Sequence, residues 1–103
     1  MLAAFSITAN GHAATDSHHD TVADIVQVVR ESGLPNRTDP MFTTVEGEWD
    51  EIFAMLRRAV DAAQTHGTRV SLNLKADIRP GYTGEMEGKL KRLETAIASR
   101  QDD

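Results

Sequence analysis

A row of polar side chains between Thr68 and Arg79 is the clearest candidate for a chemical site. Polar and apolar residues alternate along this segment, which predicts a long β-strand with one buried face. On the other face, successive polar side chains would lie about 6.5–7 Å apart. The row consists of Arg69, Ser71, Asn73, Lys75, Asp77 and Arg79. Such a row suits a solvated surface, an oligomer interface or the floor of a ligand site.

The four histidines do not form a metal-binding pattern. His18 and His19 are adjacent, so on a helix they would point about 100° apart. His12 and His66 are distant in sequence, and no His-x-x-x-His pair or cysteine accompanies them. The sequence also lacks a glycine-rich phosphate loop and a recognisable Ser–His–acid set. We therefore expect neither a metal site nor a catalytic triad.

The composition is that of an ordinary globular protein. The 103 residues suit one domain over 1–103, with 40% hydrophobic and 26% charged residues. A formal net charge of −5 argues against general nucleic-acid binding. No apolar segment approaches the roughly 20 residues of a membrane span, and no signal peptide is evident. We expect a cytoplasmic protein with neither nucleic-acid nor membrane partners.

Strand and helix patterns alternate along the chain. Strands are predicted over 2–8, 37–41, 43–46 and 68–79, with the second and third adjacent and antiparallel. Helices are predicted from N-cap candidates at 15–17 to Gly33, from about residue 48 to His66, and over 86–97.

This order of elements predicts an α+β fold, a ferredoxin-like βαββαβ sandwich with an extra C-terminal helix. The first two helices would cover one face of an antiparallel sheet, sealed by the apolar side of the long strand from Val70 to Ile78. The other face would be bare in a monomer. Leu2 and Ala4 make part of that face apolar, which favours burial by oligomerisation.

Segments spread over most of the chain match a known family in order and spacing. They are Ser32-Gly33-Leu34, the run from Met41 to Glu48, and the two ends of the long strand, Arg69-Val70 and Lys75 to Arg79. Together they resemble the thiamine-binding protein family, a small-domain group related to YkoF-type thiamine and hydroxymethylpyrimidine binders. The resemblance implies a ferredoxin-like fold and dimers or dimers of dimers built around the sheets. It also implies a thiamine-like ligand near the sheet surface and no known catalysis.

Under this resemblance, Glu46 is the leading ligand residue. A carboxylate can pair with the thiazolium charge or accept a hydrogen bond from the exocyclic amine of the pyrimidine. The alternative is that Glu46 caps or salt-bridges at a strand end. On a regular strand, Thr44 shares a face with Glu46 and Thr43 points the other way. A hydroxyl at Thr44 could fix a pyrimidine nitrogen, and the alternative is that the threonines only favour strand formation. Thr43 is also a candidate ligand residue.

The other candidate ligand residues each have a structural alternative. They are Ser6, Asn73, Lys75, Asp77 and Trp49. Asn73 can donate and accept at the edge of a heteroaromatic ring. Lys75 and Asp77 instead suit pairing across strands or subunits. Trp49 could stack on a ligand ring or pack where the second helix begins.

Two classes of function are therefore predicted. The first is an oligomeric, non-catalytic protein that binds thiamine or its hydroxymethylpyrimidine moiety near the sheet face, at or close to a subunit interface, without a further cofactor. The alternative is a small-molecule enzyme of the dimeric ferredoxin-like barrel type, with Glu46 or His66 as the acid–base group.

Overall fold

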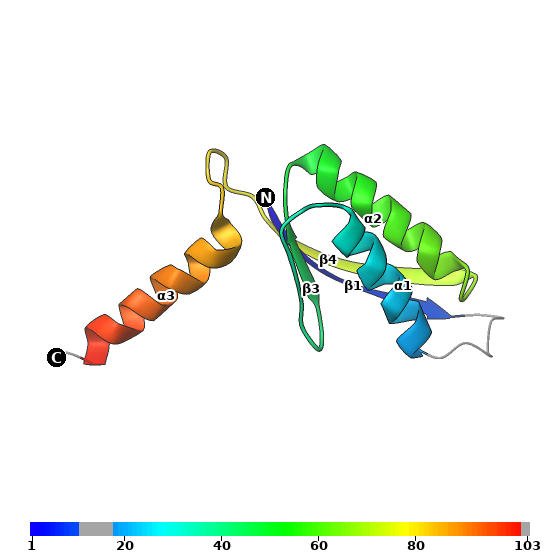
Figure 1. Cartoon of the computed structure of the whole chain (residues 1–103), viewed down its shortest axis with the longest axis horizontal. Coiled ribbons are helices and arrows are strands. Elements are labelled where there is room, and N and C mark those ends of the chain that lie inside the picture. Colours follow the sequence, from blue (N-terminus) through cyan, green and yellow to red (C-terminus); the bar gives the residue numbers. More distant parts are fainter. Residues whose placement is uncertain (11–17, 102–103) are drawn as a thin grey trace.

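The computed structural model describes residues 1–10 and 18–101 and contains four strands and three helices (Figure 1). In chain order the elements are β1 (Leu2–Asn10), α1 (His18–Glu31), β2 (Asn36–Thr38), β3 (Thr43–Glu46), α2 (Trp49–Gln64), β4 (Arg69–Asp77) and α3 (Glu85–Gln101). The predicted N-cap at 15–17 lies outside the described residues. Among the described residues, none of the helices combines the length and the hydropathy of a membrane span.

The strands form one antiparallel sheet in the order β2-β3-β1-β4. Helices α1 and α2 lie together on one face of this sheet, whereas α3 stands apart from them (Figure 1). The first strand is therefore central, as its apolar character predicts, and β2 and β3 are neighbours. The predicted ferredoxin-like α+β fold with an added C-terminal helix is confirmed.

The core lies between the sheet and the two packed helices. Its buried members are Ala3, Phe5 and Val45 from the sheet, Ile25 and Val29 from α1, and Ile52, Met55, Leu56, Ala59 and Ala63 from α2. The sheet residues alternate with residues of the opposite face, and the helix residues recur every three or four positions. The residues selected by the strand periodicity and those selected by the helix periodicity thus form a single core.

The predicted ends of three strands were wrong, and the long strand ends at Asp77 and not at Arg79. The second strand ends at Thr38 and not at Met41, because the chain turns at Asp39-Pro40, where the Asp39 N–H donates to the Phe42 carbonyl at 2.9 Å. The first strand runs on to Asn10, beyond the predicted Thr8. As a result β3 pairs with β1 only from Leu2 to Phe5, while β4 pairs with β1 as far as Asn10.

The prediction that the apolar side of the long strand seals the helices to the sheet was also wrong for most of its length. Val70 packs against the core, but Leu72 is 40% exposed, Leu74 37% and Ile78 51%. The reason is topological, since β4 is an edge strand and two helices cover four strands only in part. The sequence pattern gives the direction of these side chains but not what lies above them.

Helix α3 is an appendage with an uncovered apolar face. Leu90, Leu93 and Ile97 share one side of the helix and are all exposed. The radius of gyration is 16.2 Å, against about 13 Å for a compact domain of 100 residues, because α3 projects from the sheet.

Gly67 is required where α2 turns into β4. A Cβ atom at this position would lie 2.7 Å from the carbonyl oxygen of Asn10 and 2.9 Å from its backbone nitrogen. Gly67→Ala should therefore push β4 away from the end of β1 and lower the free energy of unfolding by about 1–3 kcal/mol, as measured by urea denaturation. Gly88→Ala is the matched control, because in α3 the new Cβ meets only the flexible end of Arg92. Equal stability of both variants would contradict this role for Gly67.

Candidate functional site

The polar row on β4 lies on the helix-free face of the sheet, together with most of the predicted ligand residues. Ala3, Phe5 and Val45 point toward the helices, so their neighbours along each strand point to the opposite, open face. The cross-strand partners on this open face are Leu2 with Glu46 and Asp77, Ala4 with Thr44 and Lys75, and Ser6 with Asn73. The predicted parity of Thr44 and Glu46 is confirmed.

The predicted ligand residues on the open face form two groups, one on β3 and one on β4. Strand β1 separates β3 from β4, so Thr44 lies about 10 Å from Lys75 across the sheet. Leu2 and Ala4 of β1 lie between the two groups, whereas Ser6 has only Asn73 of β4 as a cross-strand partner. Asn73, Lys75 and Asp77 are exposed on β4, whereas Glu46 is buried at the end of β3.

The carboxylate of Glu46 caps the N-terminus of α3. The backbone N–H of Glu85 donates to Glu46 Oε2 at 2.9 Å, and the N–H of Met86 donates to Oε1 at 3.0 Å. Burial raises the pKa of Glu46, but these hydrogen bonds outweigh it and leave the pKa below its ordinary value. The capping role considered from the sequence is therefore present. A carboxylate with a lowered pKa is also a weak base near neutral pH, which disfavours Glu46 as an acid–base catalyst.

Asp77 and Lys89 join β4 to α3 beside this cap. Lys89 Nζ contacts Asp77 Oδ2, and the hydrogen bond and charge of Lys89 lower the pKa of Asp77. Between α3 and the open face lies a shallow groove of about 240 Å³, lined by Leu2, Thr44 and Met86 among others. Thr44 is thus the predicted ligand residue that borders this groove.

Trp49 and His66 lie away from the open face. Trp49 begins α2 and stacks on Phe53 with the ring centroids 5.6 Å apart, and both side chains are about half exposed. His66 Nε2 contacts Asp24 Oδ2 of α1 at 2.5 Å. Among the described residues, no group of three or more histidine, aspartate or glutamate side chains could hold a metal ion. The side chains of His12, His18 and His19 lie outside the described part of the structure.

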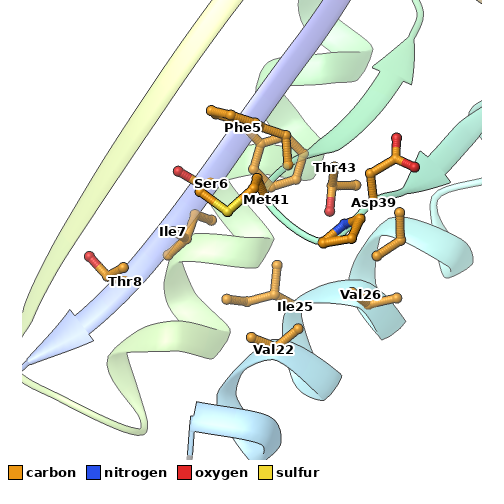
Figure 2. A pocket seen from close by; sticks show the side chains of 13 residues that line it. Phe5, Ser6, Ile7, Thr8, Val22, Ile25, Val26, Asp39, Met41 and Thr43 are labelled. Carbon is orange, nitrogen blue, oxygen red and sulfur yellow. The ribbon is translucent and has the colours of Figure 1, made fainter.

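A second concave region lies on the helix side of the sheet, where β3 stops pairing with β1. This helix-side cavity has a volume of about 210 Å³ and lies between β1, α1 and the turn from β2 to β3 (Figure 2). Its apolar walls are Phe5, Ile7, Val22, Ile25, Val26 and Met41. Figure 2 shows Thr43 beside Phe5 on one side of the cavity and Val22 and Ile25 of α1 on the opposite side.

Polar groups line one edge of the helix-side cavity. Thr43 contributes a hydroxyl, and Asp39 at the rim is held by Arg37, whose Nε lies 3.2 Å from Asp39 Oδ1. Among the described residues, no strand pairs with Ser6 to Asn10 on the side away from β4. Alternate residues of this stretch therefore direct backbone N–H and C=O groups toward the vacant side, where Ser6, Ile7 and Thr8 line the cavity.

The sequence did not predict this cavity, because the predicted strand over 37–41 runs through Asp39-Pro40, where the chain turns. The turn at Asp39-Pro40 shortens the β2–β3 hairpin, so beyond Phe5 no strand of the described residues pairs with β1 on its β3 side. Of the predicted ligand residues, Thr43 and Ser6 line this cavity, and Thr44 borders the groove on the other face. The short hairpin was the available signal of this cavity. It could be interpreted only once β1 was known to extend beyond the end of that hairpin.

The fold is that of a small ferredoxin-like domain with a concave region on either face of its sheet. The sequence pattern of the family described as "Thiamine-binding protein" matches residues 3–94. The chain belongs to this thiamine-binding protein family.

Relatives cover nearly the whole chain. UPF0045 protein Mb1933 from Mycobacterium bovis is 43% identical over 95 residues, which is 91% of each chain. Among solved structures, the hypothetical protein MJ1052 from Methanocaldococcus jannascii superposes with a TM-score of 0.78 at 30% identity, covering 90% of this chain and 94% of that one. A domain of unknown function DUF77 from Bacillus cereus gives a TM-score of 0.73 at 27% identity, covering 82% and 83%.

Proposed function

We propose that this protein binds thiamine or its hydroxymethylpyrimidine moiety without catalysis, and that the pyrimidine ring occupies the helix-side cavity. Membership of the thiamine-binding protein family supports the ligand class. The proposed position of the ring rests on one observation. Apolar side chains and the backbone groups of β1 that face no other described strand line the same cavity. An aromatic ring gains binding free energy from contact with the apolar walls. Its polar edge needs hydrogen-bond donors and acceptors in a fixed arrangement.

The chemistry of an aminopyrimidine suits this edge. Its exocyclic amine donates and the adjacent ring nitrogen accepts, and an unpaired strand edge offers the matching C=O and N–H groups. Thr43 adds a hydroxyl that can donate or accept. The volume of about 210 Å³ is below the roughly 300 Å³ of pockets for drug-sized ligands, which suits one ring and not the whole of thiamine.

The remainder of thiamine would leave the cavity past Met41 and Phe42. Both side chains are exposed beside the opening. A thiazolium cation there could lie over the Phe42 ring and near the Asp39 carboxylate. Binding of the free pyrimidine would then depend on Thr43, and the preference for thiamine over the pyrimidine would depend on Phe42 and Asp39.

Thr43→Val tests this position with little change of shape. Loss of one hydrogen bond of about 1–1.5 kcal/mol should weaken binding of thiamine and of hydroxymethylpyrimidine about tenfold in titration calorimetry. Thr44→Val is the matched control, because it makes the same change on the open face. Saturable heat from neither ligand would overturn the binding function. An effect of Thr44→Val without one of Thr43→Val would instead move the ligand to the open face, where Asn73, Lys75 and Asp77 are the further candidates.

We also propose that the protein self-associates. Large apolar side chains remain exposed on β4, α2 and α3, more than a stable monomer needs to leave in water. The family resemblance supports dimers or dimers of dimers. This proposal is separate from ligand binding, since sedimentation measures it without any ligand.

A further inference from the structure

Asp39 borders both concave regions of the protein. It lines the helix-side cavity, and it also lines the groove between α3 and the open face. The residue follows the last residue of β2, where the chain turns toward β3. Its carboxylate points away from Val22 and Ile25, which form the opposite wall of the cavity (Figure 2). A ligand that extends out of the helix-side cavity past Asp39 therefore reaches the rim of the groove.

Arg37 lies on the groove side of Asp39. It lines the groove but not the helix-side cavity, and its Nε donates to Asp39 Oδ1 at 3.2 Å. Arg37 is the cross-strand partner of Thr44, whose side chain is on the open face, so the side chain of Arg37 is on that face too. The carboxylate and the guanidinium thus follow one another from the cavity rim into the groove.

The ion pair of Arg37 and Asp39 leaves hydrogen-bonding capacity for a ligand. A guanidinium group has five N–H donors, and the bond from Nε uses one of them. Within the described residues, Asp39 is the one ion partner of Arg37. The two side chains are 57% and 43% exposed, and a surface ion pair of this kind contributes little to stability. Its rearrangement around a ligand therefore costs little.

Two further charged residues line the groove, and each is bound on its other side. Glu85 accepts from Arg92 Nη2 at 2.7 Å, and Lys89 contacts Asp77. Neither Glu85 nor Lys89 borders the helix-side cavity, whereas Arg37 is joined to its rim through Asp39. Arg37 is therefore the cation of the groove that a ligand anchored in the cavity meets first.

The order of charges along a phosphate ester of thiamine matches this pair. With the pyrimidine ring in the helix-side cavity, the ester carries outward first the thiazolium cation, then a two-carbon arm and then the phosphate anion. The protein presents outward first the Asp39 carboxylate and then the Arg37 guanidinium. Opposite charges therefore meet at both positions.

Unphosphorylated thiamine makes less use of the same pair. It ends in a neutral hydroxyl, so Arg37 gains no anion and instead weakens the attraction of Asp39 for the thiazolium. A phosphate monoester carries a charge of about −1.5 to −2 near neutral pH and has three acceptor oxygens, which a guanidinium can bind in a bidentate manner. The groove of about 240 Å³ has room for this group.

We propose that the site prefers phosphate esters of thiamine to thiamine itself, with Arg37 binding the phosphate and Asp39 beside the thiazolium. This inference rests on the proposed function, because the pyrimidine ring must occupy the helix-side cavity for the phosphate to reach Arg37. Since both charged side chains are exposed, the preference should weaken as the salt concentration rises.

Titration calorimetry with thiamine and with thiamine monophosphate tests the preference. The wild-type protein should bind the monophosphate about tenfold more tightly, a modest gain because the contact is exposed. Arg37→Gln should abolish this preference by weakening the monophosphate about tenfold, and it should bind thiamine slightly more tightly because Asp39 is no longer neutralised. Arg57→Gln is the matched control, since Arg57 is an exposed arginine of α2 paired with Asp61, and it should leave both affinities unchanged.

The outcomes separate this inference from the proposed function. A preference for the monophosphate that is lost in Arg37→Gln, with thiamine binding retained, supports it. Equal affinities of the wild-type protein for the two ligands, or a preference that survives Arg37→Gln, would overturn it while thiamine binding stands. An equal loss of both ligands in Arg37→Gln would also overturn it and would give Arg37 a structural role at the turn. Saturable heat from neither ligand would overturn the proposed function as well.

Discussion

Phe5→Ala should lower the free energy of unfolding by about 3–5 kcal/mol, the cost typical of emptying a fully buried aromatic site. Phe5 is 1% exposed at the centre of the core and also forms a wall of the helix-side cavity. Because small domains have about 5–15 kcal/mol of stability in total, much of the margin would be lost. Urea denaturation at one protein concentration would measure the effect.

Phe42→Ala is the control for this prediction. It removes the same ring from a half-exposed position at the cavity opening, where less apolar surface leaves water on folding. We expect a loss of about 1 kcal/mol or less. Similar losses for the two variants would show that Phe5 does not anchor the core. The comparison also separates core from ligand effects, because the measurement is made without thiamine.

Glu46→Gln should loosen α3 from the sheet at a cost of about 1.5–3 kcal/mol, the range for hydrogen bonds to a charged group. The amide oxygen can accept from one of the two backbone N–H groups, but the NH₂ group would face the other. Hydrogen exchange should become faster at the start of α3, and the free energy of unfolding should fall if α3 unfolds with the sheet. Glu87→Gln, an exposed change in the same helical turn, should have a small effect.

The effect of Glu46→Gln should depend on pH. The folded pKa of Glu46 is lowered, so its contribution to stability is fully present above the unfolded value near 4.5 and is lost as the pH falls through the folded pKa. Wild type and Glu46→Gln should therefore converge in stability at low pH, where Glu46 is protonated. A difference that stayed constant from neutral to strongly acidic pH would contradict the capping role.

Part of the candidate site could be predicted from the sequence because strand periodicity is local. Alternation placed Thr44 with Glu46 and set Asn73, Lys75 and Asp77 in one row, and the register confirms both. The role of Glu46 could not be fixed in this way. The N–H groups that its carboxylate accepts belong to a helix 39 and 40 residues further on, and no spacing rule links such distant segments.

The polar row of β4 separates what a local sequence pattern predicts from what depends on tertiary structure. The sequence alone determined the ferredoxin-like order of elements, the strand itself and which side chains share a face, since each depends on backbone geometry over a few residues. Only the tertiary structure decided that β4 is an edge strand with its apolar side half uncovered, that α3 is held by Glu46, and that the short hairpin opens a cavity beside β1. Those features depend on which segments pack together, and burial is a property of the neighbours and not of the residue.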